Sequence, residues 1–488
     1  MSEENIVFSD YSPSSPPKGQ IDIRIGIFFD GTQNNRNNTQ AGGNEPGHKP
    51  TPEQREAYNK YSNKEDDSYT NDLSNVARKE YWYKENKSKS VGKIYIEGIG
   101  TENSLGDKDK KLDHKGVAYG SGSTGIRAKV EKGCTEALDV IKTLKGNFEI
   151  NIITFDVYGF SRGAAAARHF TFEVTQTKPK NGLLGSLLEG GGIKYEAIKI
   201  RFLGIYDTVS SYDPNAKEST ISPDFTNDVT ELHLNTLKAQ KIIHLAASDE
   251  HRENFMLTRV RLAGGTDYFL PGVHSDVGGC YTHNMSENKQ IMDFDNTWRD
   301  GLSDEQYDTI LNNDLNNLIE QGWFKRSEVT GPNSWHETFI NRAKISNRYS
   351  FIPLHIMSEM TNKNYSDTID VENIRKAYKI PNGSEDKYYP LDLTKLKKRL
   401  DDYVNGAAPS MTYYTNRQIE DLRKQLAAKK ITAQKFNQIV EDHNLLIYLR
   451  NRYLHWNSKF GAIGYRPNFR LDTANLQVIR SRRMAPNS

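Results

Sequence analysis

"DVYGFSRGAAAARHF", residues 156–170, places a single serine between two glycines, directly ahead of an alanine-rich run. The apolar segment before the serine, rich in isoleucine, phenylalanine and valine, predicts a buried strand over residues 150–158. The run behind it predicts a helix over residues 164–170, whose small side chains allow close approach to neighbouring strands. The sequence therefore predicts a strand, a tight turn and a helix in direct succession.

A G-x-S-x-G turn between a strand and a helix is the pattern of a nucleophile elbow. In such an elbow Gly159 and Gly163 relieve the crowding around a serine whose hydroxyl stands exposed at the top of the sheet. This context predicts Ser161 as a catalytic nucleophile. The alternative is a glycine-rich structural turn that matches the pattern by chance.

Segments on both sides of the elbow extend the same architecture. Apolar runs predict further strands at 21–29, 92–100, 197–207 and 255–265. Helical segments alternate with them, and the polar, turn-rich region 34–63 is expected to be a mobile or functional loop. Buried strands alternating with helices favour an α/β-hydrolase-like fold with a mostly parallel central sheet and helices on both faces.

The last two hundred residues have a different pattern. Amphipathic segments predict helices at 302–322, where Ser303 and Gln306 form a capping box, at 393–406, and as a pair over 415–456 that breaks near Lys430-Ile431. We therefore expect a flexible N-terminal tail (1–20), an α/β-hydrolase core (21–285) and a mainly helical C-terminal region packed on the core (286–488).

Composition narrows the class of protein. The chain is 36% hydrophobic and 26% charged with a formal net charge of +2, which argues against a nucleic-acid partner or a polybasic membrane surface. The N-terminus lacks a signal-peptide pattern, and no stretch reaches the length of about 20 apolar residues that a membrane span needs.

Cys134 and Cys280 are expected to be inert free thiols. Oxygen-rich loops at 30–35 and 62–69 lack EF-hand spacing, so no metal or cofactor is expected.

A nucleophilic serine needs a base, and the base needs an acid that orients it. Asp207 ends an apolar strand, and His274 lies in a loop punctuated by proline and glycines, which gives the order Ser, Asp, His of the hydrolase fold. A strand-end cap and a backbone-bonded loop histidine are the alternatives. The competing residues are His244, His251 and His455 for the base and Asp276 for the acid, although Asp276 is expected to shape the His274 loop.

Stabilisation of the oxyanion requires backbone N–H groups aimed at the developing charge. The first is expected from Arg162, the residue after the nucleophile. The second is expected from the turn after an early strand, at Gly31, because glycine lets the backbone approach the substrate.

The sequence resembles the DUF2235 family of α/β-hydrolases, and within it the Tle1 type of phospholipase effectors of type VI secretion systems. The motifs that carry this resemblance span residues 27–357: "IFFDGTQNN" (27–35), "SYTNDLSNV" (68–76), "EGIGT" (97–101), "GFSRGAAAAR" (159–168), "GIYDTV" (204–209), "HLAASDEHRENF" (244–255), "PGVHSDVGGCY" (271–281) and, more weakly, "YSFIPLHIM" (349–357). The resemblance implies a triad of Ser161, Asp207 and His274 and gives His455 a structural role.

It also implies a serine-dependent phospholipase, of A1 or A2 type, that cleaves acyl esters of membrane glycerophospholipids and acts as an antibacterial toxin. The implied partners are a spike or tube protein of the secretion apparatus and a cognate immunity protein. The implied location is the producing cell's cytoplasm, without a signal peptide, before delivery to a target cell's membrane. A carboxylesterase or thioesterase on soluble substrates, and a catalytically idle interaction module, remain as alternatives.

One apolar segment suggests how a bilayer is engaged. Leu183, Leu184, Leu187 and Leu188 lie between glycines shortly after the elbow helix. We expect a lid that opens at a lipid surface. A segment tucked into the core is the alternative.

Overall fold

The computed structural model describes residues 16–488 except 46, 65–66, 105–114, 178–179, 218–219, 221–222, 293–301, 334–336, 385–389 and 461–463. Most of the tail predicted for residues 1–20, and part of the acidic loop 62–69, therefore lie outside the described residues.

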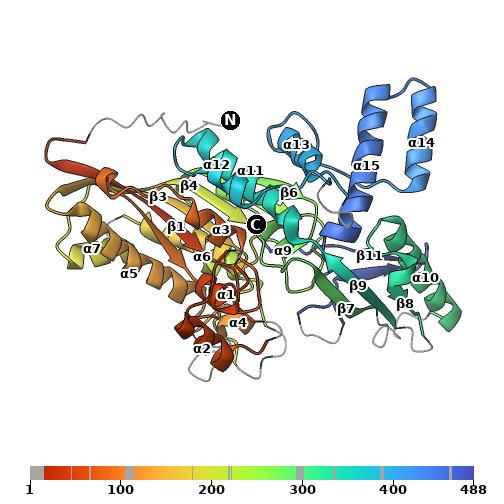
Figure 1. Ribbon diagram of the computed structural model, residues 1–488, viewed down its shortest axis with the longest axis horizontal. Coiled ribbons are helices and arrows are strands. Elements are labelled where there is room, and N and C mark those ends of the chain that lie inside the picture. The colour runs from red at the N-terminus through yellow and green to blue at the C-terminus, as the bar shows by residue number, and fades with distance from the viewer. Residues whose placement is uncertain are drawn as a thin grey trace.

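A six-stranded sheet, parallel throughout, forms the centre of the molecule (Figure 1). Its strands in spatial order are β2 (Val91–Ile96), β1 (Gln20–Phe29), β3 (Glu149–Phe160), β4 (Ala197–Tyr206), β5 (Ala239–Ala247) and β6 (Thr266–Leu270). The chain passes from β1 to β2 on one side and then to β3 on the other. The carboxyl ends of β1 and β3 thus flank the point where the strand order reverses, the usual place for a ligand crevice in such sheets.

The predicted strand at 255–265 is wrong. Its buried residues Leu257, Thr258 and Val260 do not alternate with exposed ones as in a half-buried strand, and the segment forms a loop with a 3₁₀ turn, η2 (Arg261–Ala263). The strands in this part of the chain are β5 and β6, on either side of that loop.

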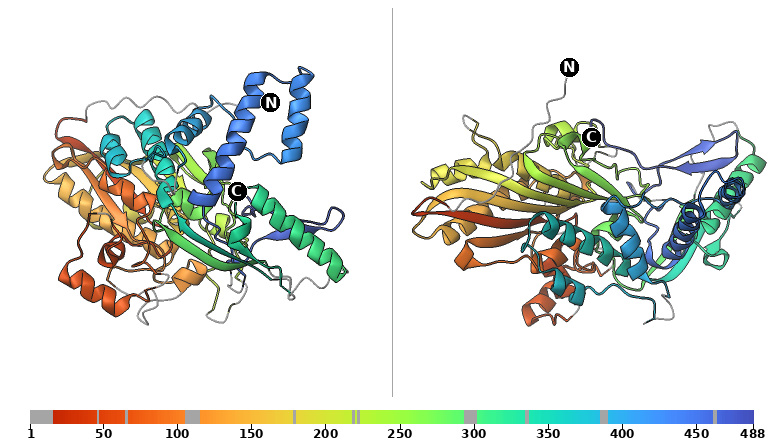
Figure 2. Two further views of the ribbon diagram at one scale, coloured as in Figure 1. Left: turned by 45° about the vertical axis from the view of Figure 1, so that its right-hand side comes forward. Right: turned by 90° about the horizontal axis from the view of Figure 1, so that it is seen from above.

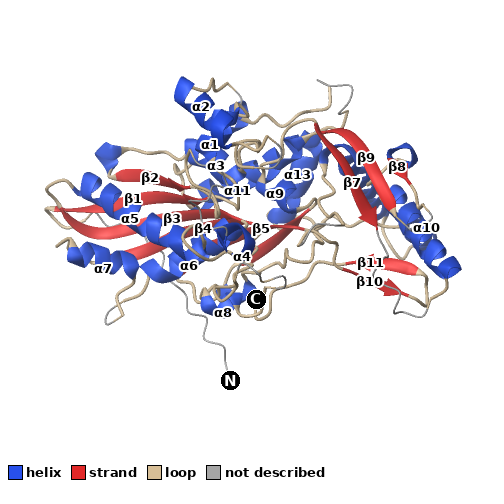
Figure 3. Ribbon diagram, turned by 90° about the horizontal axis from the view of Figure 1, so that it is seen from below, coloured by secondary structure: helices blue, strands red, loops and turns tan. Residues whose placement is uncertain are grey.

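Helices cover both faces of the sheet (Figure 3). On one face α5 (Ile126–Lys145), α6 (Arg162–Val174) and α7 (Leu183–Gly190) bury a hydrophobic cluster against β1 and β3. On the other face lie α3 (Asn75–Tyr81) and α11 (Phe351–Asn364), with α12 (Val371–Ala377) packed on α11. Burial on both faces explains why the strands read as near-continuous apolar runs.

The region 34–63, expected to be a loop, contains two helices, α1 (Arg36–Gly42) and α2 (Pro52–Tyr61). This polar stretch contains two helix N-cap residues. Asn35 caps α1, and Thr51 caps α2 through a capping box with Gln54. The remaining short helices of this half are η1 (Lys87–Lys89), α4 (Lys115–Tyr119), α8 (Asp228–Glu231) and α9 (His274–Gly278).

The C-terminal region contains the predicted helices and additional strands. The Ser303–Gln306 capping box starts α10 (Asp304–Glu320), and Thr432 caps the second helix of a pair that breaks where expected. The other elements are η3 (Arg326–Glu328), η4 (Asn347–Ser350), α13 (Leu393–Val404), α14 (Asn416–Ala427), α15 (Ala433–Tyr453), an antiparallel sheet of β7 (Met285–Met292), β9 (Thr338–Ile345) and β8 (Val329–Thr330), and the hairpin of β10 (Phe469–Asp472) and β11 (Gln477–Arg480). The α14–α15 pair projects from the body (Figures 1 and 2).

None of the helices in the described part of the chain is both long and apolar enough to cross a bilayer.

Candidate active site

The turn after β3 has the strained geometry of a nucleophile elbow. Ser161 has φ 58° and ψ −129°, a conformation that L-residues rarely adopt and that places its side chain at the end of the sheet. A Cβ on Gly159 would lie 2.4 Å from the carbonyl oxygen of Gly163, and a Cβ on Gly163 would lie 2.2 Å from that of Asp30. Glycine is thus required at both positions, because helix α6 starts in direct contact with its own strand and with β1.

Ser161 lies beside the start of the loop that carries Asp207. Phe160 pairs in register with Tyr206, and the Ser161 amide donates to the Tyr206 carbonyl at 3.1 Å. Asp207 is the first residue after β4 and also has a positive φ, of 39°. The two neighbouring parallel strands therefore bring the serine and the acid to the same edge of the sheet.

His274 completes the group; it was predicted in a loop but is the first residue of the short helix α9, which follows β6. Its Nδ1 lies 2.5 Å from Oδ2 of Asp207. Because a carboxylate only accepts hydrogen bonds, Nδ1 carries the proton in the neutral ring, which leaves Nε2 as the proton acceptor. The Phe160 ring, next to Ser161, packs against the imidazole with centroids 4.6 Å apart. The structure thus brings the predicted base and acid into contact and places the predicted nucleophile at the neighbouring strand end.

The other candidate histidines are held elsewhere in the part of the chain that the structure describes. His244 bonds Asp267 through Nδ1 at 2.8 Å and accepts from the Thr208 amide through Nε2 at 2.9 Å. His251 forms a hydrogen bond through Nε2 with Oγ of Ser458 at 2.8 Å. Both rings are therefore committed to structural contacts.

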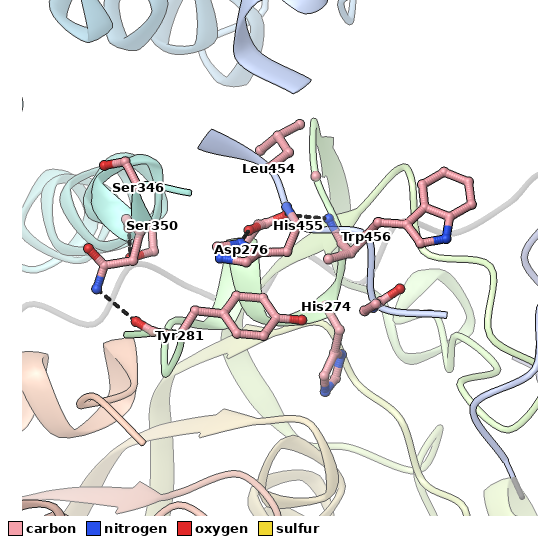
Figure 4. A network of polar contacts seen from close by, with 12 residues as sticks. His274, Asp276, Tyr281, Ser346, Ser350, Leu454, His455 and Trp456 are labelled. Carbon is pink, nitrogen blue, oxygen red and sulfur yellow. Dashed lines mark hydrogen bonds and ion pairs between the residues drawn. The ribbon is translucent and has the colours of Figure 1, made fainter. Parts of the chain in front are cut away.

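His455 forms a second histidine–carboxylate pair. Its Nδ1 lies 2.7 Å from Oδ1 of Asp276, its ring stacks on Tyr281 with centroids 3.9 Å apart, and its amide donates to Asp276 at 3.1 Å. Asp276 also accepts from the Val273 amide at 3.0 Å. Figure 4 shows Asp276 and His455 facing each other while His274 points away from the pair. Asp276 therefore shapes the loop that presents His274.

Electrostatics keep the acid charged and the base neutral. Burial alone raises the pKa of Asp207, but the Arg482 guanidinium and the hydrogen bond from His274 outweigh it and hold that pKa well below its usual value. Burial lowers the pKa of His274 below 6.5, and this effect outweighs the opposing contribution of Asp207. A neutral imidazole beside an ionised carboxylate is the arrangement that general-base catalysis needs.

Of the two predicted oxyanion donors, one starts a helix and the other is engaged in a hydrogen bond. Arg162 occupies the first position of α6, where amides have no partner inside the helix. Its side chain donates to the Val117 carbonyl at 2.8 Å and to Thr32 Oγ1 at 3.3 Å, which ties the elbow to the turn after β1. The Gly31 amide, however, donates to the Asp30 carboxylate at 2.8 Å, so this hydrogen bond has to be given up before Gly31 can act.

The contact that sequence reasoning missed comes from the C-terminus. Arg482 donates from Nη1 to Oδ1 and from Nη2 to Oδ2 of Asp207, at 2.6 and 2.8 Å. Asp207 also accepts from the Ala247 amide at 2.8 Å. No motif surrounds Arg482, and only the fold reveals that its side chain reaches the acid.

The predicted lid does not lie at the site. Leu184 and Leu188 are fully buried in the cluster shared with α5, and Leu183 and Leu187 pack against that cluster. Gly182 lies against Glu173 near the end of α6, and a helix of this length places that end about 20 Å from the elbow. The structure agrees with the alternative that the segment belongs to the core.

The triad is nearly closed to solvent. Ser161 is 5% and His274 is 4% exposed. The Phe255 ring packs on His274 with centroids 5.1 Å apart, and Tyr465 lies on the outer side of Phe255 at 6.0 Å. Phe255 and Tyr465 thus form an aromatic cluster beside His274.

The described residues include no group of three or more His, Cys, Asp or Glu side chains arranged to hold a metal ion. Cys134 and Cys280 are buried and not bridged, and burial raises the pKa of the Cys280 thiol to about 12. Both thiols are thus kept in the unreactive protonated form.

The chain is similar in part of its sequence and in its fold to known proteins. Residues 189–299, which include Asp207 and His274, match the family model of the catalytic domain of Tle1-like phospholipase effectors of type VI secretion systems. The fold resembles that of a Tle1 effector bound to the VgrG spike from the type VI secretion system, with a TM-score of 0.53 and 18% identity over 100% of this chain and 94% of that chain. An uncharacterized protein from Pseudomonas aeruginosa gives a TM-score of 0.40 and 16% identity over 90% of this chain and 65% of that one. No curated protein sequence matches the chain.

The resemblance to Tle1-type effectors is thereby confirmed, by the family model over residues 189–299 and by the fold over the whole chain.

Proposed function

We propose that the protein is a serine-dependent phospholipase A that hydrolyses acyl ester bonds of membrane glycerophospholipids through an acyl-enzyme. The observation that carries the proposal is the combination of the strained Ser161 elbow with a hydrogen-bonded His274–Asp207 pair at the same sheet edge. The phospholipid substrate rests on the family match over residues 189–299.

Each residue has a defined task in the reaction. Ser161 Oγ attacks the acyl carbonyl carbon while His274 Nε2 takes its proton, and Asp207 orients the ring and stabilises its charged form. The Arg162 amide, at the positive end of α6, stabilises the oxyanion of the tetrahedral intermediate. Collapse expels the lysophospholipid alkoxide, which receives the proton from His274. Water, deprotonated by the same imidazole, then releases the fatty acid.

We further propose that the enzyme is an antibacterial effector that type VI secretion delivers to the membrane of a target cell. A spike protein is the proposed carrier, because the structurally similar Tle1 effector is bound to the VgrG spike. A cognate immunity protein would protect the producing cell.

The test is fatty-acid release from phospholipid vesicles by the purified protein and by Ser161→Ala, with circular dichroism to check folding. Release that disappears in the variant supports the proposal. Cleavage of a short soluble ester without release from vesicles would replace it by an esterase. Turnover of neither substrate, with or without a spike protein, would leave an interaction module.

A further inference from the structure

The predicted acid of the triad is held by Arg482, six positions before residue 488. The side chain of Arg482 is 5% exposed, and all three of its guanidinium nitrogens donate hydrogen bonds. Two of them form the fork on Asp207, while Nε donates to the Phe255 carbonyl at 2.9 Å. A planar, bidentate contact of this kind fixes the plane of a carboxylate, which lysine cannot do.

The backbone around Arg482 is itself fixed beside the site. Leu257 donates to the Arg483 carbonyl and accepts from the Ala485 amide, both at 2.9 Å. The next residue, Thr258, donates to the Thr208 carbonyl at 3.0 Å. The C-terminal segment is thus joined through 257–258 to the residue that follows Asp207.

Charges around His274 are balanced only when Arg482 is counted. The imidazole contacts Asp207 through Nδ1, and the His274 amide donates to Glu250 at 3.2 Å. Arg252 neutralises Glu250 through Nε and Nη2 at 3.1 and 3.0 Å. Arg482 neutralises Asp207 in the same way.

The remaining ionisable groups that pack around this loop are paired with one another. Asp249 accepts from Arg450 of α15 at 2.9 Å, and Asp276 pairs with His455. Burial lowers the pKa of His251 to about 4, so this ring stays neutral. Loss of the Arg482 charge would therefore leave one uncompensated negative charge beside His274.

We propose that Arg482 is a positioning residue of the triad, which fixes the carboxylate plane of Asp207 and offsets its charge so that His274 remains a neutral base in mildly acidic solution. The proposal rests on the serine-hydrolase function above. Asp207 alone would favour the charged imidazolium, which cannot accept the proton of Ser161. The C-terminal arginine limits this effect while leaving the orienting hydrogen bond in place.

The experiment compares Arg482→Gln, which removes the charge, with Arg482→Lys, which keeps the charge but loses the fork. Arg480→Gln is the matched control, because Arg480 lies two residues earlier and forms a similar bidentate pair, at 2.5 and 2.7 Å, with Asp314, which is outside the predicted triad. The first readout is the pKa of His274 in the full chain, from NMR titration of ring-labelled histidine assigned with His274→Gln. The second is the pH dependence of fluorophosphonate labelling of Ser161.

Arg482→Gln is expected to raise the pKa of His274, and with it the labelling midpoint, by about one pH unit. Arg482→Lys should keep the wild-type midpoint but label about tenfold more slowly at its plateau, because the acid is less well oriented. Arg480→Gln should match the wild type in both measurements. If Arg482→Gln does not fold, Arg482→Lys alone tests the positioning role. A plateau labelling rate of Arg482→Lys equal to that of the wild type would overturn that role.

An unchanged pKa of His274 in Arg482→Gln would overturn the proposal, as would an equal shift in Arg480→Gln. The NMR readout does not depend on catalysis. Absence of labelling in the wild type would therefore refute the hydrolase function, while the pKa of His274 would still decide the electrostatic role of Arg482.

Discussion

Replacing Gly163 by alanine should disrupt the catalytic site with little change to the rest of the fold. The added Cβ would lie 2.2 Å from the Asp30 carbonyl oxygen and 2.5 Å from that of Phe29, both backbone atoms of the turn after β1. Restoring an ordinary contact of 3.4 Å requires α6 and β1 to separate by about 1 Å, and a displacement of that size at a catalytic group costs on the order of 100-fold in rate. The strain should also lower the free energy of unfolding by about 1–3 kcal/mol.

Gly190→Ala is the matched control, because a Cβ at this last residue of α7 meets no atom within 4 Å. It should leave kcat/KM unchanged and stability equal or slightly higher. The assay is kcat/KM on a short soluble ester, corrected for the fraction of active sites by burst titration, together with thermal unfolding. Full activity and an unchanged Tm in Gly163→Ala would refute the close contact between the elbow and β1.

Three further predictions follow from burial and charge. Because burial lowers the pKa of His274 below 6.5, kcat/KM should fall by about tenfold per pH unit only below that value; a midpoint above 7 in a pH–rate profile would contradict this. Leu187→Ser with Leu188→Ser should lower Tm and reduce vesicle and soluble-ester turnover together, since Leu188 is fully buried; selective loss of vesicle activity at an unchanged Tm would restore the lid. Burial raises the pKa of Asp228 to about 7, so the folded state loses stability as pH rises from about 4 to 7. Asp228→Asn should therefore unfold at a higher temperature than the wild type near pH 8 but not near pH 4. An equal difference in unfolding temperature at both pH values would contradict this role of the Asp228 carboxyl group.

The sequence predicts those parts of the site that depend on short, contiguous motifs or on the ends of strands. The residues of the elbow are contiguous in the sequence. Its glycines are required by contacts within the turn and with the end of the neighbouring strand β1. Asp207 and His274 were found because the carboxyl ends of parallel strands meet at one edge and because the hydrolase fold has a known residue order. The residue order alone did not separate His274 from His455; the resemblance to Tle1-type effectors favoured His274, and His455 is bonded to Asp276.

The parts that could not be predicted depend on contacts distant in the sequence. Arg482 reaches Asp207 across 275 positions, and nothing in its neighbourhood distinguishes it from the adjacent arginine Arg483. The leucines of α7 have the composition of either a lid or a core helix, and only packing against α5 decides between them. The predicted strand at 255–265 is wrong because its apolar residues belong to the loop that connects β5 to β6.

The most direct test of the account is the site of covalent modification by a fluorophosphonate, mapped by peptide mass spectrometry on the native full-length protein and on His274→Ala. The account predicts a single adduct on Ser161 in the native protein and labelling slowed by at least about a thousandfold in the variant, because the serine then lacks its base. An adduct on another residue, or equal labelling of both proteins, would contradict the assignment of Ser161 and His274 as nucleophile and base.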